Sequence, residues 1–143
     1  MNSKLYPYIL AVITLIFWGI APIFGKLGLS KISPLLGLAI RSFVISIILL
    51  IIVFATGTYK EFGAITLKGF SFIALEGIFA SLIGHFAYYY ALKLGETSNI
   101  VPITSAFPVI TVILAIFLLS EKMTIFKGGG MMLIIAGIIL MRF

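Results

Sequence analysis

Long uncharged stretches of apolar residues follow one another along the chain, and short polar segments separate them. A helix that crosses a bilayer needs about 20 mostly apolar residues, because each residue advances it by about 1.5 Å. The pattern therefore predicts five membrane-spanning helices, one of which continues through a lone Glu76. The predicted spans cover residues 6–27, 33–55, 68–92, 98–119 and 123–141.

The apolar stretches show no alternation of apolar and polar residues. A membrane β-barrel alternates them in segments of about 10 residues, so the pattern favours helices. The first stretch is too long for a cleaved signal peptide, and four more stretches follow it. We therefore predict an all-α integral membrane bundle in which residues 1–143 form a single transmembrane domain with no soluble part.

Composition agrees with a membrane protein and excludes several kinds of chemistry. Apolar residues make up 62% of the 143 residues and charged residues only 10%, whereas soluble domains carry about 25% charged residues. There is no Cys, no Asp and a single His, too few groups for a disulfide, a thiolate nucleophile or a metal cluster. No phosphate-binding loop is present either. We expect no enzymatic activity, no cofactor and no metal.

Positive charges are divided almost evenly between the two predicted membrane surfaces. Lys4, Lys60, Lys68, Lys122 and Lys127 fall on the N-terminal side, and Lys26, Lys31, Lys93 and Arg142 on the other. An excess of Lys and Arg normally marks the cytoplasmic side, so five against four gives little bias. Two interpretations stay open: a protein with its N-terminus inside, or dual topology with copies that pair antiparallel. The net charge of +6 is attributed to lysines anchoring helix ends, not to a nucleic-acid surface.

Three ionisable residues, Arg41, Glu76 and His85, lie inside the predicted spans. Such groups cost about 2.5–3.5 kcal/mol on insertion scales and are functional candidates by default. Each also has a purely structural interpretation: Arg41 can reach toward the surface, Glu76 can be a neutral packing residue, and His85 can tie helices together. Nine residues separate Glu76 from His85, which corresponds to about 180° on an α-helix, so we expect them to face opposite ways.

The depths of these three residues suggest a partner. Glu76 lies about 12 Å from the surface on the N-terminal side, and Arg41 and His85 lie about as far from the opposite surface. In an antiparallel dimer, Glu76 of one copy would be level with Arg41 and His85 of the other. We therefore expect cross-chain pairing to lower the cost of burying these groups.

Prolines inside the spans are candidate hinges, namely Pro22, Pro102 and Pro108. Each interrupts the backbone hydrogen bonds of a helix, which is tolerated in a membrane where the irregular backbone faces protein or water. Thr104, Ser105 and Thr111 in the fourth span are polar groups that could line a substrate path. They could equally repair the interrupted backbone.

Several short motifs follow one another along the chain. They are Phe17-Trp18-Gly19, Ser33-Pro34-Leu35, Arg41-Ser42-Phe43, Tyr89-Tyr90-Ala91-Leu92-Lys93, Pro102, Phe107-Pro108-Val109-Ile110-Thr111, Leu119-Ser120-Glu121-Lys122 and Gly137-Ile138-Ile139-Leu140. Taken in order, they resemble an EamA domain of the drug/metabolite transporter superfamily. The match extends over nearly the whole chain. The family resemblance implies a secondary transporter of small metabolites, usually built from two inverted five-helix copies in one chain.

Because this sequence holds one such copy, the resemblance implies an alternating-access exporter of a small metabolite or drug-like solute that works as an antiparallel homodimer in a prokaryotic cell membrane. By analogy with the related four-helix small multidrug resistance proteins, Glu76 would be the group that couples transport to protons. Trp18, Tyr88 and Thr111 would contact the solute, and Pro108 would act as a hinge. The alternative is a membrane subunit that does not transport and belongs to a hetero-oligomeric complex.

Overall fold

The computed structural model describes residues 5–141, so Lys4 and Arg142 of the charge comparison lie outside the described residues. Every regular element in this range is helical. The helices are α1 (Tyr6–Gly28), α2 (Pro34–Thr56), the 3₁₀ helix η1 (Thr58–Ala64), α3 (Leu67–Glu76), the π-helix η2 (Gly77–Gly84), α4 (His85–Leu94), α5 (Thr97–Thr104), α6 (Phe107–Leu119) and α7 (Ile125–Met141).

Four helical stretches are long and apolar enough to cross a membrane: Tyr6–Gly28, Pro34–Thr56, Leu67–Leu94 and Thr97–Leu119. The third joins α3, η2 and α4, and the fourth joins α5 and α6. The apolar helix α7 has 17 residues, at the lower limit of spanning length. The predicted all-α membrane bundle is confirmed, and each predicted span begins and ends within two residues of the observed helix.

Polar and left-handed residues set the ends of the helices. The Ser33 hydroxyl accepts a hydrogen bond from the Leu36 amide at 3.2 Å, and the Thr66 hydroxyl accepts one from the Gly69 amide at 3.1 Å. These side chains replace the carbonyl partners that the first amides of a helix lack. Gly57 ends α2 with φ of 76°, a left-handed conformation that suits glycine because it has no Cβ.

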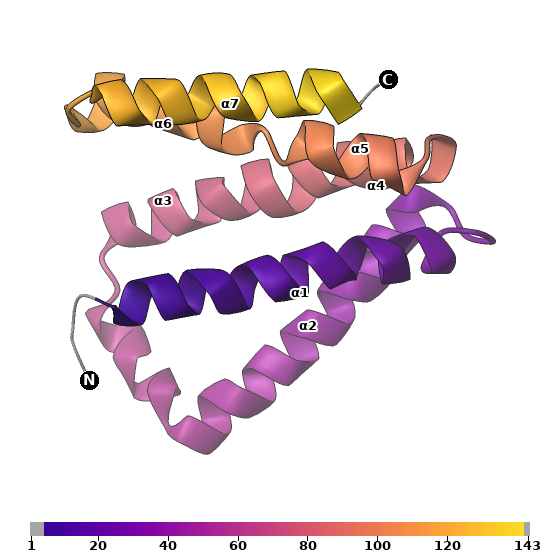
Figure 1. Ribbon diagram of the computed structural model, residues 1–143. Helices are drawn as coiled ribbons and strands as arrows, with labels where there is room; N and C mark the ends of the chain where they lie inside the picture. Colours follow the sequence, from indigo (N-terminus) through magenta and orange to yellow (C-terminus); the bar gives the residue numbers. More distant parts are fainter. Residues whose placement is uncertain (1–4, 142–143) are drawn as a thin grey trace. The chain divides into compact units, whose positions relative to one another are not determined.

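The described chain divides into two compact units, residues 5–94 and 95–141. In the first unit α4 packs against both α1 and α2. Figure 1 shows α1 and α2 close together near the loop that joins them and diverging toward their other ends. The buried leucines of the unit, Leu29, Leu38 and Leu92, belong to the converging end. Most other large apolar side chains are exposed, as expected of helices surrounded by lipid.

Two glycines allow the helices of this unit to approach closely. A Cβ on Gly37 of α2 would lie 2.8 Å from Cδ2 of Leu29 and 3.5 Å from the ring of Tyr89 in α4. A Cβ on Gly25 of α1 would lie 3.4 Å from Cδ1 of Leu92. Tyr89 and Leu92 therefore fit against the backbones of α1 and α2, an arrangement that small residues permit in membrane bundles.

Two lysines fasten the same end of the unit. Nζ of Lys26 in α1 donates a hydrogen bond of 2.6 Å to the carbonyl of Leu92, and Nζ of Lys93 donates one of 2.6 Å to the carbonyl of Ile32. Cations near the last turn of a helix satisfy carbonyls that have no amide partner and interact favourably with the helix dipole. These bonds tie α1 to α4 and α4 to the segment that precedes α2.

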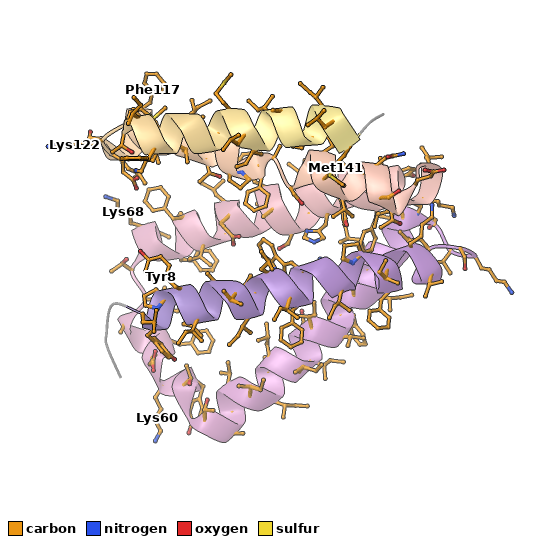
Figure 2. The ribbon with its side chains drawn as sticks, in the orientation of Figure 1. Tyr8, Lys60, Lys68, Phe117, Lys122 and Met141 are labelled. Carbon is orange, nitrogen blue, oxygen red and sulfur yellow. The ribbon has the colours of Figure 1, made fainter. Side chains whose placement is uncertain are left out.

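The opposite end of the first unit carries the lysines that were predicted there. Figure 2 shows Tyr8, Lys60 and Lys68 at the same end of the unit, at the start of α1, in η1 and at the start of α3. Lys26, Lys31 and Lys93 belong to the other end, by their places at the helix termini. The alternating direction of successive helices therefore separates the charges as the sequence predicts.

In the second unit α7 packs against α5 and α6. The fourth span was predicted as one helix, but the structure interrupts it at Ser105 and Ala106. Pro108 explains the break, because proline has no amide hydrogen and its ring clashes with the carbonyl four residues earlier. The amides of Ala106 and Val109 turn instead to carbonyls three residues back, those of Ile103 and Ala106.

Substituting Gly37→Ala should lower the free energy of unfolding by about 1–3 kcal/mol, because the new methyl group overpacks against the fully buried Leu29. The measurement is unfolding in detergent micelles followed by tryptophan fluorescence. Gly28→Ala is the control, since nothing lies within 4 Å of a Cβ there. Equal stability of the two variants would show that α1, α2 and α4 do not pack as described.

Candidate functional site

Glu76 is the last residue of the ten-residue helix α3 and is exposed. At about 1.5 Å per residue, it lies about 13 Å from the start of the span Leu67–Leu94. Among the residues that the structure describes, none forms a hydrogen bond or ion pair with its carboxylate. A carboxylate at this depth is costly unless a proton, a cation or another molecule meets it.

Arg41 lies seven residues inside α2 and is half-buried. Within residues 5–141 its guanidinium makes no hydrogen bond or ion pair. The backbone carbonyls that would satisfy a purely structural arginine are therefore not its partners here. Arg41 and Glu76, which carry opposite charges, thus have no hydrogen-bond or ion-pair partner in the described chain.

His85 begins α4 and bonds back across η2. Its Nδ1 lies 2.9 Å from the carbonyl oxygen of Ala80, and its backbone amide also bonds to that oxygen. A carbonyl oxygen only accepts hydrogen bonds, so Nδ1 is the nitrogen that carries the proton. In the neutral ring Nε2 is then the proton acceptor. His85 thus ties the helix, one of its expected roles, and still offers an acceptor nitrogen.

An aromatic cluster surrounds the imidazole of His85. The ring centroids of Tyr88 and Tyr89 lie 6.1 and 6.2 Å from that of His85, both in edge-to-face geometry. All three side chains are half-buried. Edge-to-face pairs are favourable, and together with the packing of Tyr89 against α1 and α2 they fix the orientation of the imidazole.

The π-helix η2 separates Glu76 from His85, which corrects the expected angle between them. The value of about 180° assumed an uninterrupted α-helix, whereas η2 occupies all eight residues from Gly77 to Gly84. A π-bulge accommodates an extra residue in a wide turn, so nine residues turn about as far as eight α-helical ones. The two groups then lie about 80° apart, on neighbouring faces of the span.

The remaining predicted residues are spread over both units. Trp18 in α1 is 63% exposed. Thr111 in α6 donates a hydrogen bond of 3.2 Å to the carbonyl of Phe107 and lines an open hollow of about 270 Å³. The other lining residues are apolar: Leu114, Ala115, Leu118 and Leu119. The structure thus brings His85 and Tyr88 together, while Thr111 belongs to the other unit.

The candidate hinge prolines differ in their surroundings. Pro22 is buried in an α1 that continues through it, and Pro102 lies inside α5. Pro108 is in the first turn of α6, directly after the break. Thr104 and Ser105 both donate hydrogen bonds to the carbonyl of Val101, at 2.9 and 2.8 Å. The same carbonyl also accepts the Ser105 amide at 2.9 Å, so the two hydroxyls bond to a backbone group that already has a partner.

Sequence reasoning missed the packing of Tyr89, the role of Ala80 and the π-helix. Two glycines on other helices make room for the Tyr89 ring, which residue types alone do not indicate. Ala80 bonds to His85 through its backbone carbonyl, and a backbone group gives no signal in the sequence. Within residues 5–141 no group of three His, Cys, Asp or Glu side chains could hold a metal ion.

A helical membrane protein with ionisable residues at mid-depth is typical of proteins that move solutes or ions across membranes. The EamA-like transporter family model matches residues 5–143, so this chain belongs to the EamA-like transporter family. A protein of Sinorhizobium sp, named an uncharacterized transporter in cobO 3'region, is 30% identical over 131 residues, which are 92% of each chain. An uncharacterized protein of Methanocaldococcus jannaschii is 34% identical over 133 residues, 93% of each chain. No solved structure gives a significant match.

The geometry of His85 predicts its tautomer. In the neutral ring, Nδ1 should carry the proton because it faces the Ala80 carbonyl at 2.9 Å. The chain has one His, so ¹⁵N NMR of the histidine-labelled protein in bilayers gives a single assignable imidazole. A neutral ring with its proton on Nε2 would contradict the described contact.

Proposed function

We propose that this chain is a secondary transporter that exports a small metabolite or drug-like solute by alternating access, coupled to protons at Glu76. Membership of a transporter family supports the class, and the unpartnered carboxylate of Glu76 at mid-depth is the observation that carries the coupling. A carboxylate there exchanges a proton for a solute only if both can reach it in turn, which is the logic of alternating access. The relatives come from a bacterium and an archaeon, which supports a prokaryotic cell membrane as the location.

We infer further that the transporting unit is an antiparallel homodimer. Glu76 lies about 13 Å from one surface, while Arg41 and His85 lie about 10 and 13 Å from the other, counted from the ends of their helices. Inverting a second copy places its Glu76 level with both residues of the first. A single gene then supplies the inverted halves that transporters commonly use. The two relatives have nearly the same length as this chain.

In this dimer the two Glu76 residues would face the solute path from both copies. Trp18 and Tyr88 would provide aromatic walls, and Thr111 a hydroxyl beside the apolar hollow of α6. Pro108 would let the half-helices α5 and α6 change their angle. Because the walls carry few polar groups, the solute class suited to them is amphipathic, with a charged or polar group that interacts with Glu76.

Glu76→Gln should lower solute-driven proton flux at least tenfold, because an amide cannot release a proton. The measurement uses purified protein in liposomes that contain a pH-sensitive dye, exposed to a panel of amino acids, nucleosides and organic cations. Glu61→Gln in η1 is the matched control, since this glutamate lies outside the spans. Absence of flux from the unmodified chain with every solute would favour the alternative of a subunit in a hetero-oligomeric complex.

The antiparallel dimer predicts that the region around Arg41 in one copy lies close to the region around Glu76 in the other. When a Ser42→Cys chain is mixed with a Leu75→Cys chain, a short bifunctional reagent should link them, since these residues neighbour Arg41 and Glu76 and leave both charges in place. Thr56→Cys at the end of α2 should not be linked to Leu75→Cys.

Reporters fused after Phe143, itself outside the described residues, should appear on both sides of the membrane. A signal from one side only would contradict dual topology.

A further inference from the structure

The π-helix η2 joins two halves of one span that are held very differently. The half after it, α4, is fastened by the buried Leu92, by Tyr89 against Gly37 and by the Lys26 bond to the Leu92 carbonyl. The half before it, α3, has no extensive contact with α1 or α2 in the described part of the chain. Glu76 is the last residue of this loosely held half. The direction of its side chain therefore depends on the register of η2.

The wide register of η2 rests on two specific features. His85 donates to the Ala80 carbonyl through Nδ1 and through its backbone amide, which also bonds to the Leu82 carbonyl. An α-helical amide at this position would bond to Ser81. Gly84 supplies the second feature, because a Cβ there would lie 3.0 Å from the carbonyl oxygen of Phe79, five residues earlier. The wide turn thus needs the imidazole of His85 and the missing side chain of Gly84.

We propose that η2 is a register switch in which His85 is a positioning residue for Glu76. In the π register Glu76 and His85 lie about 80° apart, so both can face one water-filled path near the bilayer midplane. When η2 relaxes to an α-helix, α3 turns by about 100° relative to the fastened α4 and the span lengthens by about 1.5 Å. Glu76 then moves to the face opposite His85. The rotation of α3 is argued from the structure alone, and only its role in transport rests on the proposed function.

The two registers differ in the carbonyls to which the backbone amides of η2 bond, five residues back in one and four residues back in the other. The backbone of the span stays paired in both, because the amides that leave carbonyls five residues back find carbonyls four residues back. No residue of the fastened end has to move, so Leu92 and Tyr89 keep their contacts. A turn of this kind carries a carboxylate from one side of a helix to the other without exposing backbone groups to lipid.

The sharpest test compares Gly84→Ala with Gly77→Ala. Both add one methyl group to η2, but a Cβ on Gly77 meets nothing within 4 Å, whereas that on Gly84 meets the Phe79 carbonyl. Spin labels on Thr14→Cys in α1 and Ser71→Cys in α3 report the turn as a change in their distance distribution, and the chain has no other Cys. Gly84→Ala should shift the distribution and Gly77→Ala should not. Identical distributions would overturn the proposal.

Variants of His85 test its positioning role. His85→Phe removes the donor to Ala80, and the loss of one hydrogen bond should change the ratio of the two registers about fivefold. His85→Asn places an amide N–H near the position of Nδ1 and should restore the original distance distribution. If Asn and Phe behave alike, the bond to Ala80 does not hold the register.

Flux in liposomes then separates this proposal from the transport proposal. Gly84→Ala should reduce solute-driven proton flux at least tenfold relative to Gly77→Ala, because Glu76 is held on the wrong face. A shifted distance with equal flux in the two variants would overturn the positioning of Glu76. If the unmodified chain shows no flux, the transport proposal fails, while the distance measurement still decides whether the register switch exists.

Discussion

A chain that crosses hydrocarbon must pair its backbone amides and carbonyls within each crossing, because lipid offers no hydrogen bonds. This constraint makes the chain helical, and it also makes each departure from α-helical pairing informative. The described residues depart from it at the π-helix η2 and at the break between α5 and α6. At both departures backbone amides take other carbonyls: that of His85 bonds to Ala80 at the first, and those of Ala106 and Val109 bond to carbonyls three residues back at the second.

Packing in residues 5–94 is concentrated at one end. Leu29, Leu38 and Leu92 are buried there, and glycines admit Tyr89 between helices. Toward the other end α1 and α2 diverge (Figure 1), and the large apolar side chains are exposed. In water this arrangement would be unstable, but in lipid an exposed apolar side chain carries no such penalty, because lipid tails are as apolar as the side chains. The packed end around these leucines therefore holds the unit together, while the rest of the helices face lipid.

The sequence predicts the spans well because apolar length alone decides whether a helix crosses a bilayer. It also begins the second predicted span at Ser33, whose hydroxyl caps α2. The break before Pro108 was expected only as a hinge inside one helix, since proline shows where a helix is weakened but not how the chain responds. The register of η2 is not predictable from residue types. Glycines and a histidine occur in many ordinary α-helices, and the π turn depends on a carbonyl, that of Ala80, with no sequence signature.

The lysine bonds at the packed end have a consequence for substitutions of the basic residues. Lys26 and Lys93 hold the carbonyls of Leu92 and Ile32, so replacing either one loosens the fold as well as altering the charge on that side. Lys31, Lys60 and Lys68 make no such cross-helix bonds in the described chain and can be exchanged at little structural cost. Exchanges at these three lysines therefore change the charge at either end of the unit while the cross-helix bonds of Lys26 and Lys93 stay in place.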